Sequence, residues 1–520
     1  MSKYYKEKYD VIVIGASLAG LASALTLLPK GFDVLVLEQH NLPGGVATSF
    51  SRGGVEIEAS LHEMMSIGEK DCPLKIRRFL EENGVNVDWI RVPIAYRYID
   101  PDTDVVIHAG KNGDFSIPSK EIADACGDID GSLAKRINNF LNLCLRCYNS
   151  LDYLSIHELS KLKMIKDHPD FVRTLGYGFE DVAKKFDLPQ KAIDILIAYW
   201  IYIGTPTDDM PFTIGAYLLA DYLGYGSYIP RMTSHELALK MMEQVIAKGA
   251  QVELNQRVNK ILVKDNKVYG VRLASGEEIH APYVISGAYP NTVFSKMIEP
   301  KSEVPAKAIK WTNSMELGVS CFSVVMMLDR SYEELGIKDY ATFYAPYGNR
   351  TRKIYDSGKE LNKWEYITSI CTNIAHENAS PKGTCIYSIT YLPDGDSFKG
   401  VTAENYHEYK DKIVNHFLEM ESKRLGVNLK DHILEIIIET PVTISHYTGA
   451  YMGTIYGYRH SLKNHAVARK LMDKNEHYIS GLAFAGSHQV SGDGMAPAIT
   501  NGRKGAKDII DEDKARKAGR

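Results

Sequence analysis

The 520-residue sequence has only seven cysteines, an odd and small number. Secreted proteins built on disulfide frameworks carry far more, so that class is excluded and a reducing compartment, the cytoplasm, is expected. Only Cys144 and Cys147 have the CxxC spacing, inside a segment, 136–151, that is expected to be helical, and no second pair completes a zinc site. We therefore expect structural thiols and no bound metal.

An excess of basic residues is also missing. Lysine and arginine number 61 against 65 for aspartate and glutamate, which gives a net charge of −4. Proteins that bind nucleic acid are expected to carry a basic excess, so nucleic acid is not an expected partner. The same balance argues against an enzyme that modifies RNA.

No continuous apolar run is long enough to cross a membrane, which takes about 20 residues. The uncharged stretch 11–29 is interrupted by glycines, and the uncharged stretch 440–458 is rich in Thr, Ser, His and Tyr. The polar N-terminus does not fit a signal peptide. A transmembrane helix is therefore not expected, whereas peripheral membrane contact and the oligomeric state stay open.

What is present is a complete βαβ unit near the N-terminus. Hydrophobic patterns predict a buried strand over 9–14, a helix over 21–28 and a second strand over 33–38. The turn between the first strand and the helix reads Gly-Ala-Ser-Leu-Ala-Gly, which is the dinucleotide fingerprint with serine at its middle glycine. The glycines allow a tight turn and close packing of the helix, whose N-terminus offers N–H groups to a pyrophosphate.

The second strand ends in Glu38. A carboxylate at that place accepts hydrogen bonds from ribose hydroxyls and repels a 2′-phosphate, so FAD or NAD is favoured over NADP. No second fingerprint with its own βαβ unit occurs, and a separate NAD(P)H domain is not expected. The candidate cofactor residues of this unit are Gly15, Ala16, Ser17, Ala19, Gly20, Glu38 and Gln39.

The next segment resembles a known family. The run Pro43-Gly44-Gly45-Val46 resembles the Pro-Gly-Gly-Arg of FAD-dependent phytoene desaturases, carotene isomerases and retinol saturases, a branch of the amine-oxidase-like flavoproteins. Here valine replaces the arginine. Residues 57–62, Ile-Glu-Ala-Ser-Leu-His, are similar to that family's Phe-Asp-Thr-Gly-Ile-His, which returns beneath the flavin ring. The resemblance implies FAD as the cofactor, contacts at Gly44, Gly45, Val46 and Thr48, and protonic roles for His62 and Glu63, although a lone histidine is also a common structural residue.

Two later blocks extend the resemblance. Strands are predicted over 251–263, 268–274 and 277–286, and the resemblance places the backbone of Val258 beside the adenine. Near the C-terminus, a short strand over 477–487 leads into a glycine-rich turn and a helix. A helix N-terminus stabilises the negative charge of a reduced flavin. By resemblance, this C-terminal contact is made by Gly486, Gly494 and Met495.

These blocks predict an α/β fold with two parts. A discontinuous, Rossmann-like FAD-binding domain of the glutathione-reductase type is expected to comprise 1–90, 226–295 and 441–520. An α+β substrate domain is expected to comprise 91–225 and 296–440. The sequence has 32 tyrosines but only 15 phenylalanines, which suits apolar walls with polar tips and a lipid that carries a polar end.

The resemblance implies an FAD-dependent oxidoreductase that acts on a C–C bond of an apolar, unsaturated lipid such as a polyene, isoprenoid or fatty acid. A hydride would pass between flavin N5 and one carbon, and a protonic group would serve the other carbon. Saturation, desaturation and redox-neutral isomerisation stay open, and the histidine motif favours the saturase or the isomerase. Two alternatives are a flavin amine or amino-acid oxidase, against which the missing arginine counts, and a non-catalytic FAD-binding protein.

Overall fold

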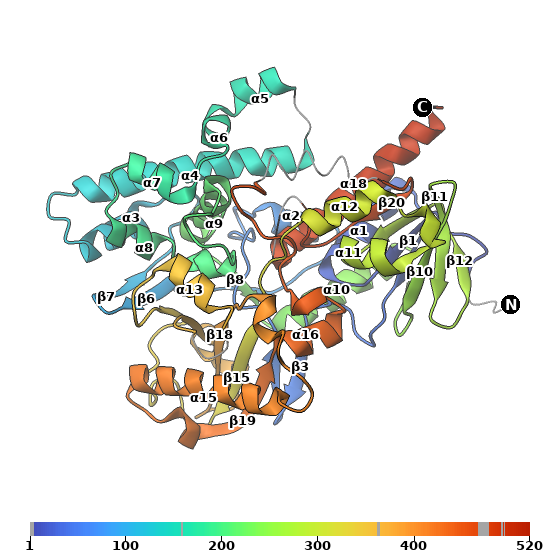
Figure 1. Ribbon diagram of the computed structural model, residues 1–520. Helices are drawn as coiled ribbons and strands as arrows, with labels where there is room; N and C mark the ends of the chain where they lie inside the picture. The colour runs from blue at the N-terminus through green and yellow to red at the C-terminus, as the bar shows by residue number, and fades with distance from the viewer. Residues whose placement is uncertain are drawn as a thin grey trace.

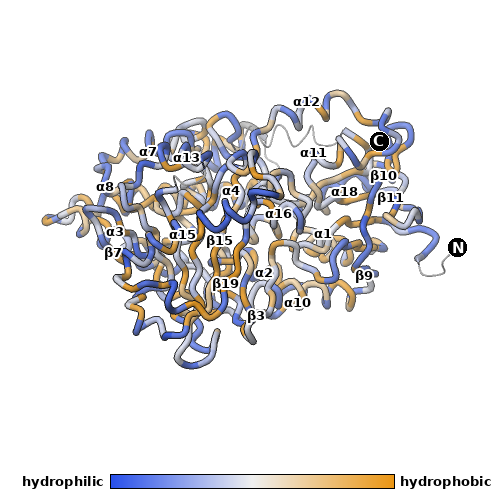
Figure 2. The backbone as a smooth tube through the Cα atoms, turned by 60° about the horizontal axis from the view of Figure 1, so that its bottom comes forward, coloured by the Kyte–Doolittle hydropathy of each residue, from blue (hydrophilic) through white to orange (hydrophobic). Residues whose placement is uncertain are grey.

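Three larger sheets and the helices around them make up the computed structural model of the protein, with the two chain ends on the same side, at right in Figure 1. Hydrophobic stretches gather in the interior strands, and hydrophilic ones lie mostly in the outer helices and turns (Figure 2). Among the described residues, no helix is both long and apolar enough to span a membrane. The structure describes residues 5–157, 160–360, 364–465, 478–489, 492 and 494–519.

A five-stranded parallel sheet is assembled from three distant parts of the chain. Its central strands are buried along their whole length, which explains their unbroken runs of Val, Ile and Leu. In the strand 11–14, Val11 and Val13 belong to one hydrophobic core, whereas Ile12 and Ile14 belong to a second core on the other face of the sheet. The order of its strands is β20 (Leu482–Phe484), β13 (Tyr283–Ser286), β1 (Val11–Ile14), β2 (Val34–Leu37) and β9 (Gln251–Glu253).

Helix α1 (Leu18–Leu27) covers one face of the parallel sheet and packs between α10 (Thr233–Ala247) and α18 (Met495–Lys517). The contact with α18 is close, because a Cβ atom on Gly502 would lie 2.0 Å from the carbonyl oxygen of Ala19. The N- and C-terminal helices are therefore held together directly beside the fingerprint turn.

A four-stranded sheet packs on the other face of the parallel sheet and shares one hydrophobic core with it. The order of its strands is β12 (Glu278–His280), β11 (Lys267–Leu273), β10 (Val258–Lys264) and β14 (Ile298–Glu299).

The prediction of single strands over 251–263 and 277–286 is wrong. Each range is divided between the parallel sheet and the four-stranded sheet. Asn255 has a left-handed backbone (φ +58°), which turns the chain out of the parallel sheet, and Pro282 lies at the second break, where it cannot donate a ladder hydrogen bond. Within the described part of 477–487, only Leu482–Phe484 is a strand, and His477 lies outside the described residues.

A seven-stranded mixed sheet forms the second half of the molecule. The order of its strands is β19 (Ile433–Glu439), β15 (Phe322–Leu328), β18 (Cys385–Tyr391), β17 (Ile367–Cys371), β16 (Ala341–Tyr344), β6 (Tyr96–Asp100) and β7 (Thr103–Ile107). Its pairs are antiparallel except for one parallel pair, between β16 and β6.

Helices α3 (Ser116–Ala125), α4 (Ser132–Ile156) and α9 (Phe212–Tyr225) pack beside this sheet, at left in Figure 1. The helix predicted over 136–151 lies within α4, where Cys144 and Cys147 are buried, and all seven cysteines are free thiols. Among the described residues, the other α-helices are α2 (Lys75–Glu82), α5 (Lys161–Asp167), α6 (Pro169–Thr174), α7 (Phe179–Lys185), α8 (Gln190–Leu196), α11 (Pro290–Thr292), α12 (Ala306–Ser314), α13 (Thr351–Ser357), α14 (Thr372–Ala375), α15 (Tyr406–Leu425) and α16 (Pro441–Thr448). Two small antiparallel pairs join β3 (Ser49–Arg52) to β4 (Val55–Glu58) and β5 (Trp89–Arg91) to β8 (Tyr228–Pro230).

Candidate active site

A cavity of about 1690 Å³ extends from the parallel sheet to the seven-stranded sheet. Glu38 and Val258 line it beside the first sheet, and Thr368 and Thr390 line it on the second. Cavities that hold one ligand usually measure roughly 300–1,000 Å³. This one therefore has room for a large cofactor and a substrate together.

The fingerprint turn between β1 and α1 requires its two glycines for different reasons. Gly15 has φ +99°, a backbone conformation that L side chains rarely adopt. A Cβ atom on Gly20 would lie 2.0 Å from the carbonyl oxygen of Gly15. Between them, Ser17 caps α1, since its Oγ accepts a hydrogen bond from the Gly20 N–H at 3.3 Å. Serine at the middle position is thus compatible with the turn.

Glu38 is buried and held against this turn. Its Oε2 accepts a hydrogen bond from the Ala16 N–H at 2.7 Å, and its Oε1 accepts one from the His40 N–H at 2.9 Å. Both Glu38 and Gln39 line the cavity. The carboxylate is therefore fixed at the cavity wall, where a ribose would lie.

The Gly44-Gly45 turn lies directly on the fingerprint turn. The Gly44 N–H donates to the Ala16 carbonyl oxygen at 2.8 Å. A Cβ atom on Gly44 would lie 2.1 Å from the Ala47 carbonyl oxygen, and one on Gly45 would lie 3.3 Å from the Ser17 Cβ. A side chain at Gly44 would therefore disrupt its own turn, and one at Gly45 would press against the fingerprint turn.

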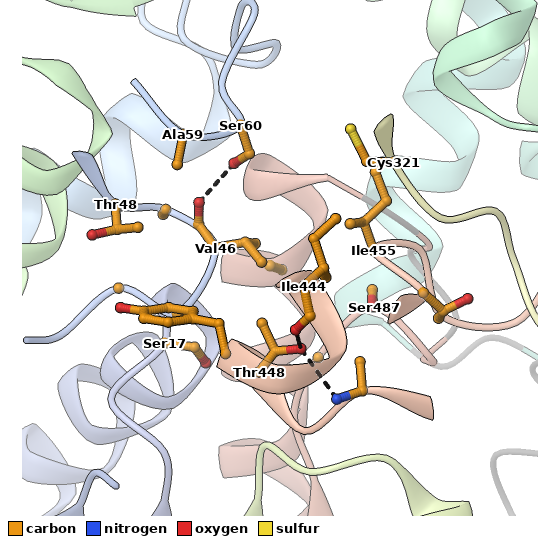
Figure 3. A pocket seen from close by; sticks show the side chains of 18 of the residues that line it. Ser17, Val46, Thr48, Ala59, Ser60, Cys321, Ile444, Thr448, Ile455 and Ser487 are labelled. Atoms are coloured by element: carbon orange, nitrogen blue, oxygen red, sulfur yellow. Dashed lines mark hydrogen bonds between the residues drawn. The ribbon is translucent and has the colours of Figure 1, made fainter. Parts of the chain in front are cut away.

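Val46 and Thr48 line the cavity on the same side (Figure 3). The Val46 carbonyl oxygen accepts a hydrogen bond from the Ser60 hydroxyl at 2.6 Å, and its side chain is 37% exposed. Ile444 and Thr448 of α16 line the cavity as well (Figure 3). An apolar group therefore stands where the resembling family carries arginine.

The other predicted cofactor residues come from the centre and the end of the chain. Val258 begins β10, and Gly486 and Gly494 have the positive φ values +143° and +97°. Met495 begins α18, whose N-terminus faces the cavity. These four residues, Gly15, Ser17 and Ala19 all line the cavity. Ala16 and Gly20 do not line it: the Ala16 N–H bonds to Glu38, and Gly20 packs against Gly15.

This arrangement fits FAD. Two helix N-termini, those of α1 and α18, meet at one cavity, and each offers unpaired N–H groups to negative charge. Gly287, which follows β13, adds a further close approach, since a Cβ atom there would lie 2.8 Å from the Ile14 carbonyl oxygen. Among the described residues, no group of three or more His, Cys, Asp or Glu side chains is arranged to hold a metal ion.

His62 lies on the cavity wall, between the two halves of the molecule. Its Nδ1 is 3.3 Å from the hydroxyl of Tyr202, and its Nε2 is 3.2 Å from the Oγ1 of Thr390. Burial lowers the pKa of His62 to about 4, so the ring is neutral at pH 7. Both ring nitrogens already have a partner, which suits a positioning role better than direct proton transfer.

Glu63 has the opposite character. Its Oε2 accepts a hydrogen bond from the Ser227 hydroxyl, and the hydroxyls of Tyr202 and Tyr199 also interact with the carboxyl. Burial raises the pKa of Glu63 to about 8, against the opposing effect of these three hydroxyls. A neutral carboxyl therefore lines the cavity at neutral pH and is able to donate a proton.

Sequence reasoning missed a row of polar side chains across the seven-stranded sheet. Ser323 pairs in register with Glu439 on one side and Thr390 on the other, and Thr390 pairs with Thr368. Residues in direct register share one face of a sheet, and all four line the cavity. We call Glu439, Ser323, Thr390 and Thr368 the polar row. A hydroxyl or carboxyl at one position of each strand is the only signal in the sequence, and strand pairing is needed to recognise it.

His40 and Tyr447 were missed as well. Their rings stack at 4.1 Å with an interplanar angle of 13°, and both line the cavity. The pair joins the segment after β2 to α16. No motif in either segment predicts that contact.

The comparisons with known proteins agree with this geometry. The sequence profile of flavin-containing amine oxidoreductases matches residues 18–510. The chain belongs to this family. It is an FAD-dependent oxidoreductase, as the fingerprint turn and the second glycine turn indicate.

Two similar relatives are named for prolycopene and for all-trans-retinol. Prolycopene isomerase 1 of an Oncidium hybrid is 26% identical over 469 residues, which cover 87% of this chain and 75% of the relative. All-trans-retinol 13,14-reductase of Danio rerio is 25% identical over 487 residues, which cover 88% and 78%. An oxidoreductase structure from Methanosarcina mazei has the same fold, with a TM-score of 0.59 and 17% identity over 96% of this chain and 100% of that one.

Proposed function

We propose that this flavoenzyme acts on a C–C bond of an apolar, unsaturated lipid, as a saturase or as a redox-neutral isomerase, with desaturation as the reverse reaction. The observation that carries the proposal is the neutral Glu63 carboxyl, which lines the same cavity as the residues of the fingerprint turn. Protonation of a carbon needs such an acid next to a bound apolar chain. The names of the isomerase and reductase relatives point to the same class of substrate.

Each part of the wall then has a role. FAD supplies hydride chemistry at N5 when it is bound. Glu63 holds the proton on Oε1 and donates it to the substrate carbon, while His62 keeps its place between Tyr202 and Thr390. The residues proposed to hold FAD are Gly15, Ala16, Ser17, Ala19, Gly20, Glu38, Gln39, Gly44, Gly45, Val46, Thr48, Val258, Gly486, Gly494 and Met495.

We also propose that the chain forms two domains. Segments 1–90, 226–295 and 441–520 would form the FAD-binding domain, and 91–225 with 296–440 would form the substrate domain. All strands of the parallel sheet come from the first set of segments, and all strands of the seven-stranded sheet come from the second set, which supports most of this division. In detail, β14 and α12 pack with the four-stranded sheet, which favours a later boundary than 296.

We also propose a cytoplasmic location with peripheral membrane contact. Seven free thiols support a reducing compartment. Helix α5, at the top of Figure 1, exposes 82% of Leu162 and 54% of Ile165 beside the exposed Lys163 and Lys166. Apolar side chains flanked by lysine suit the surface of an anionic membrane.

An anaerobic assay tests the reaction. The flavin of the purified holoenzyme is reduced, retinoids, carotenoids and unsaturated fatty acids are added, and the flavin spectrum and the lipid are followed together. Reoxidation with a saturated product establishes a saturase, and an altered double bond without reoxidation establishes an isomerase. If no lipid and no flavin signal changes, and amines reduce the oxidised enzyme instead, the proposal is overturned in favour of an amine oxidase.

A further inference from the structure

The inner chamber is the part of the cavity beside the seven-stranded sheet, where the polar row and Glu63 lie. We infer that it binds an oxygen-bearing polar group of the substrate, a hydroxyl or a carbonyl, at these residues. This inference rests on the proposed function and narrows its substrate class. It separates lipids with a polar end from pure hydrocarbons, which the proposed function admits equally.

The first observation is the geometry of the polar row. Its members stand on four neighbouring strands, which lie about 4.8 Å apart in a sheet, so their side chains form a continuous polar strip on the chamber floor. All of these strands belong to the seven-stranded sheet, whereas every residue proposed to hold FAD lies outside it. The strip is therefore available to a second molecule.

The second observation is the pattern of hydrogen bonds within this group. Ser323 and Thr390 bond to each other at 2.9 Å, and Thr390 also meets His62. The Oγ1 of Thr368 has no partner among the described residues, although this residue is only 1% exposed. Buried polar atoms are nearly always hydrogen-bonded, so an orphan hydroxyl on the cavity, beside the paired hydroxyls of the polar row, indicates a ligand that supplies the missing partner.

The third observation is the apolar character of the rest of the chamber. Apolar side chains from several segments of the chain line the same cavity as the strip. An apolar end group placed at the strip would leave the Thr368 hydroxyl unpaired, whereas an oxygen would accept a hydrogen bond from it and would suit the neutral Glu63 carboxyl. The apolar residues are Met64, Met65, Ile201, Leu218, Leu392 and Phe398.

The test uses two C20 polyenes that differ in one group: all-trans-retinol and the hydrocarbon in which hydrogen replaces its hydroxyl. Each is titrated into the oxidised holoenzyme, and Kd is obtained from the change in the flavin spectrum. We expect the alcohol to bind about tenfold more tightly, and we expect Thr368→Val to reduce this ratio severalfold.

Thr368→Val also has a thermal signature. Because it replaces an unpartnered buried hydroxyl by a methyl group of similar shape, it should raise the Tm of the ligand-free holoenzyme while it weakens binding of the alcohol. The matched control is Thr342→Val, a buried threonine on the neighbouring β16 that does not line the cavity, and it should leave the Kd ratio unchanged.

The outcomes separate the two proposals. Equal Kd values for alcohol and hydrocarbon, or a ratio that Thr368→Val leaves unchanged, overturn the polar-group inference. Turnover of the hydrocarbon with equal affinities leaves the proposed function standing. If neither polyene binds or is converted, the proposed function fails and the inference fails with it.

Discussion

The Nε2 atom of His62 lies 3.2 Å from the Oγ1 of Thr390, a residue 328 positions further along the chain. One of these residues follows β4 beside the cofactor cleft, and the other belongs to β18 of the seven-stranded sheet. Their contact therefore joins the two halves of the molecule at the chamber where we place the reaction.

Glu63→Gln keeps the shape of the side chain and removes its acidic proton. Loss of general acid catalysis usually costs 10²–10⁴-fold, so we expect kcat for lipid conversion to fall by roughly that factor, with KM changed little. Rapid mixing of the reduced variant with substrate measures the step directly. FAD content should match the wild type, and an unchanged rate would remove Glu63 from the mechanism.

Activity should depend on pH through the same carboxyl. Because burial raises the pKa of Glu63 to about 8, the acid is protonated below that value, and kcat for saturation should be constant there and fall as pH rises above it. The titratable groups that face Glu63 are the buried tyrosines at 199, 202, 222 and 340, whose own pKa values are raised. A pH series for the wild type and Glu63→Gln checks the assignment, since the decline near pH 8 should be absent from the variant's residual rate.

Thr390→Val should destabilise the protein, in contrast to Thr368→Val. It leaves His62 Nε2 and Ser323 Oγ without a partner, and an unsatisfied buried group costs about 1–3 kcal/mol. Urea denaturation followed by fluorescence measures the change in the free energy of unfolding. Identical stability changes for both variants would contradict the hydrogen-bond assignment.

Gly20→Ala should abolish FAD binding, because its Cβ atom would lie 2.0 Å from the Gly15 carbonyl oxygen and would displace the fingerprint turn. The matched control is Gly400→Ala, at a glycine with no atoms within 4 Å of the added Cβ and no positive φ. The flavin-to-protein absorbance ratio after purification measures the effect. Full FAD content in the Gly20→Ala protein would show that the turn tolerates the methyl group.

The double substitution Leu162→Gln and Ile165→Gln should weaken association with anionic vesicles without changing FAD content. Both side chains are exposed on α5 and contribute little to the core, so stability should hardly change. Cosedimentation with vesicles of phosphatidylcholine and phosphatidylserine measures binding. Equal sedimentation of the variant and the wild type would remove α5 from the contact.

The sequence predicted the α/β fold, FAD and the family because those properties depend on local patterns. Gly15 and Gly20 bracket one turn, and Glu38 follows one strand later, so their spacing alone indicates a cofactor cleft. The family profile confirms this interpretation. The roles of the individual residues stay predictions.

The substrate chamber could not be predicted in the same way. Ser323, Thr390 and Thr368 come together only through the order 15-18-17 of their strands, which no short-range pattern encodes. The strand over 251–263 failed for a related reason: one hydrophobic run serves two sheets, and only Asn255 marks the change. Tertiary pairing decides such cases, not propensity.

The parallel sheet has a consequence for how the protein folds during its synthesis. Its edge strand β20 and the helix α18, whose N-terminus faces the cofactor cleft, leave the ribosome long after β1 and α1. Helix α1 must therefore wait for a partner helix that begins more than 450 residues later, and such long-range pairing is slow. Flavin loading is consequently expected to follow the synthesis of α18, and a chain that ends before β20 would expose the edge of β13 that β20 covers.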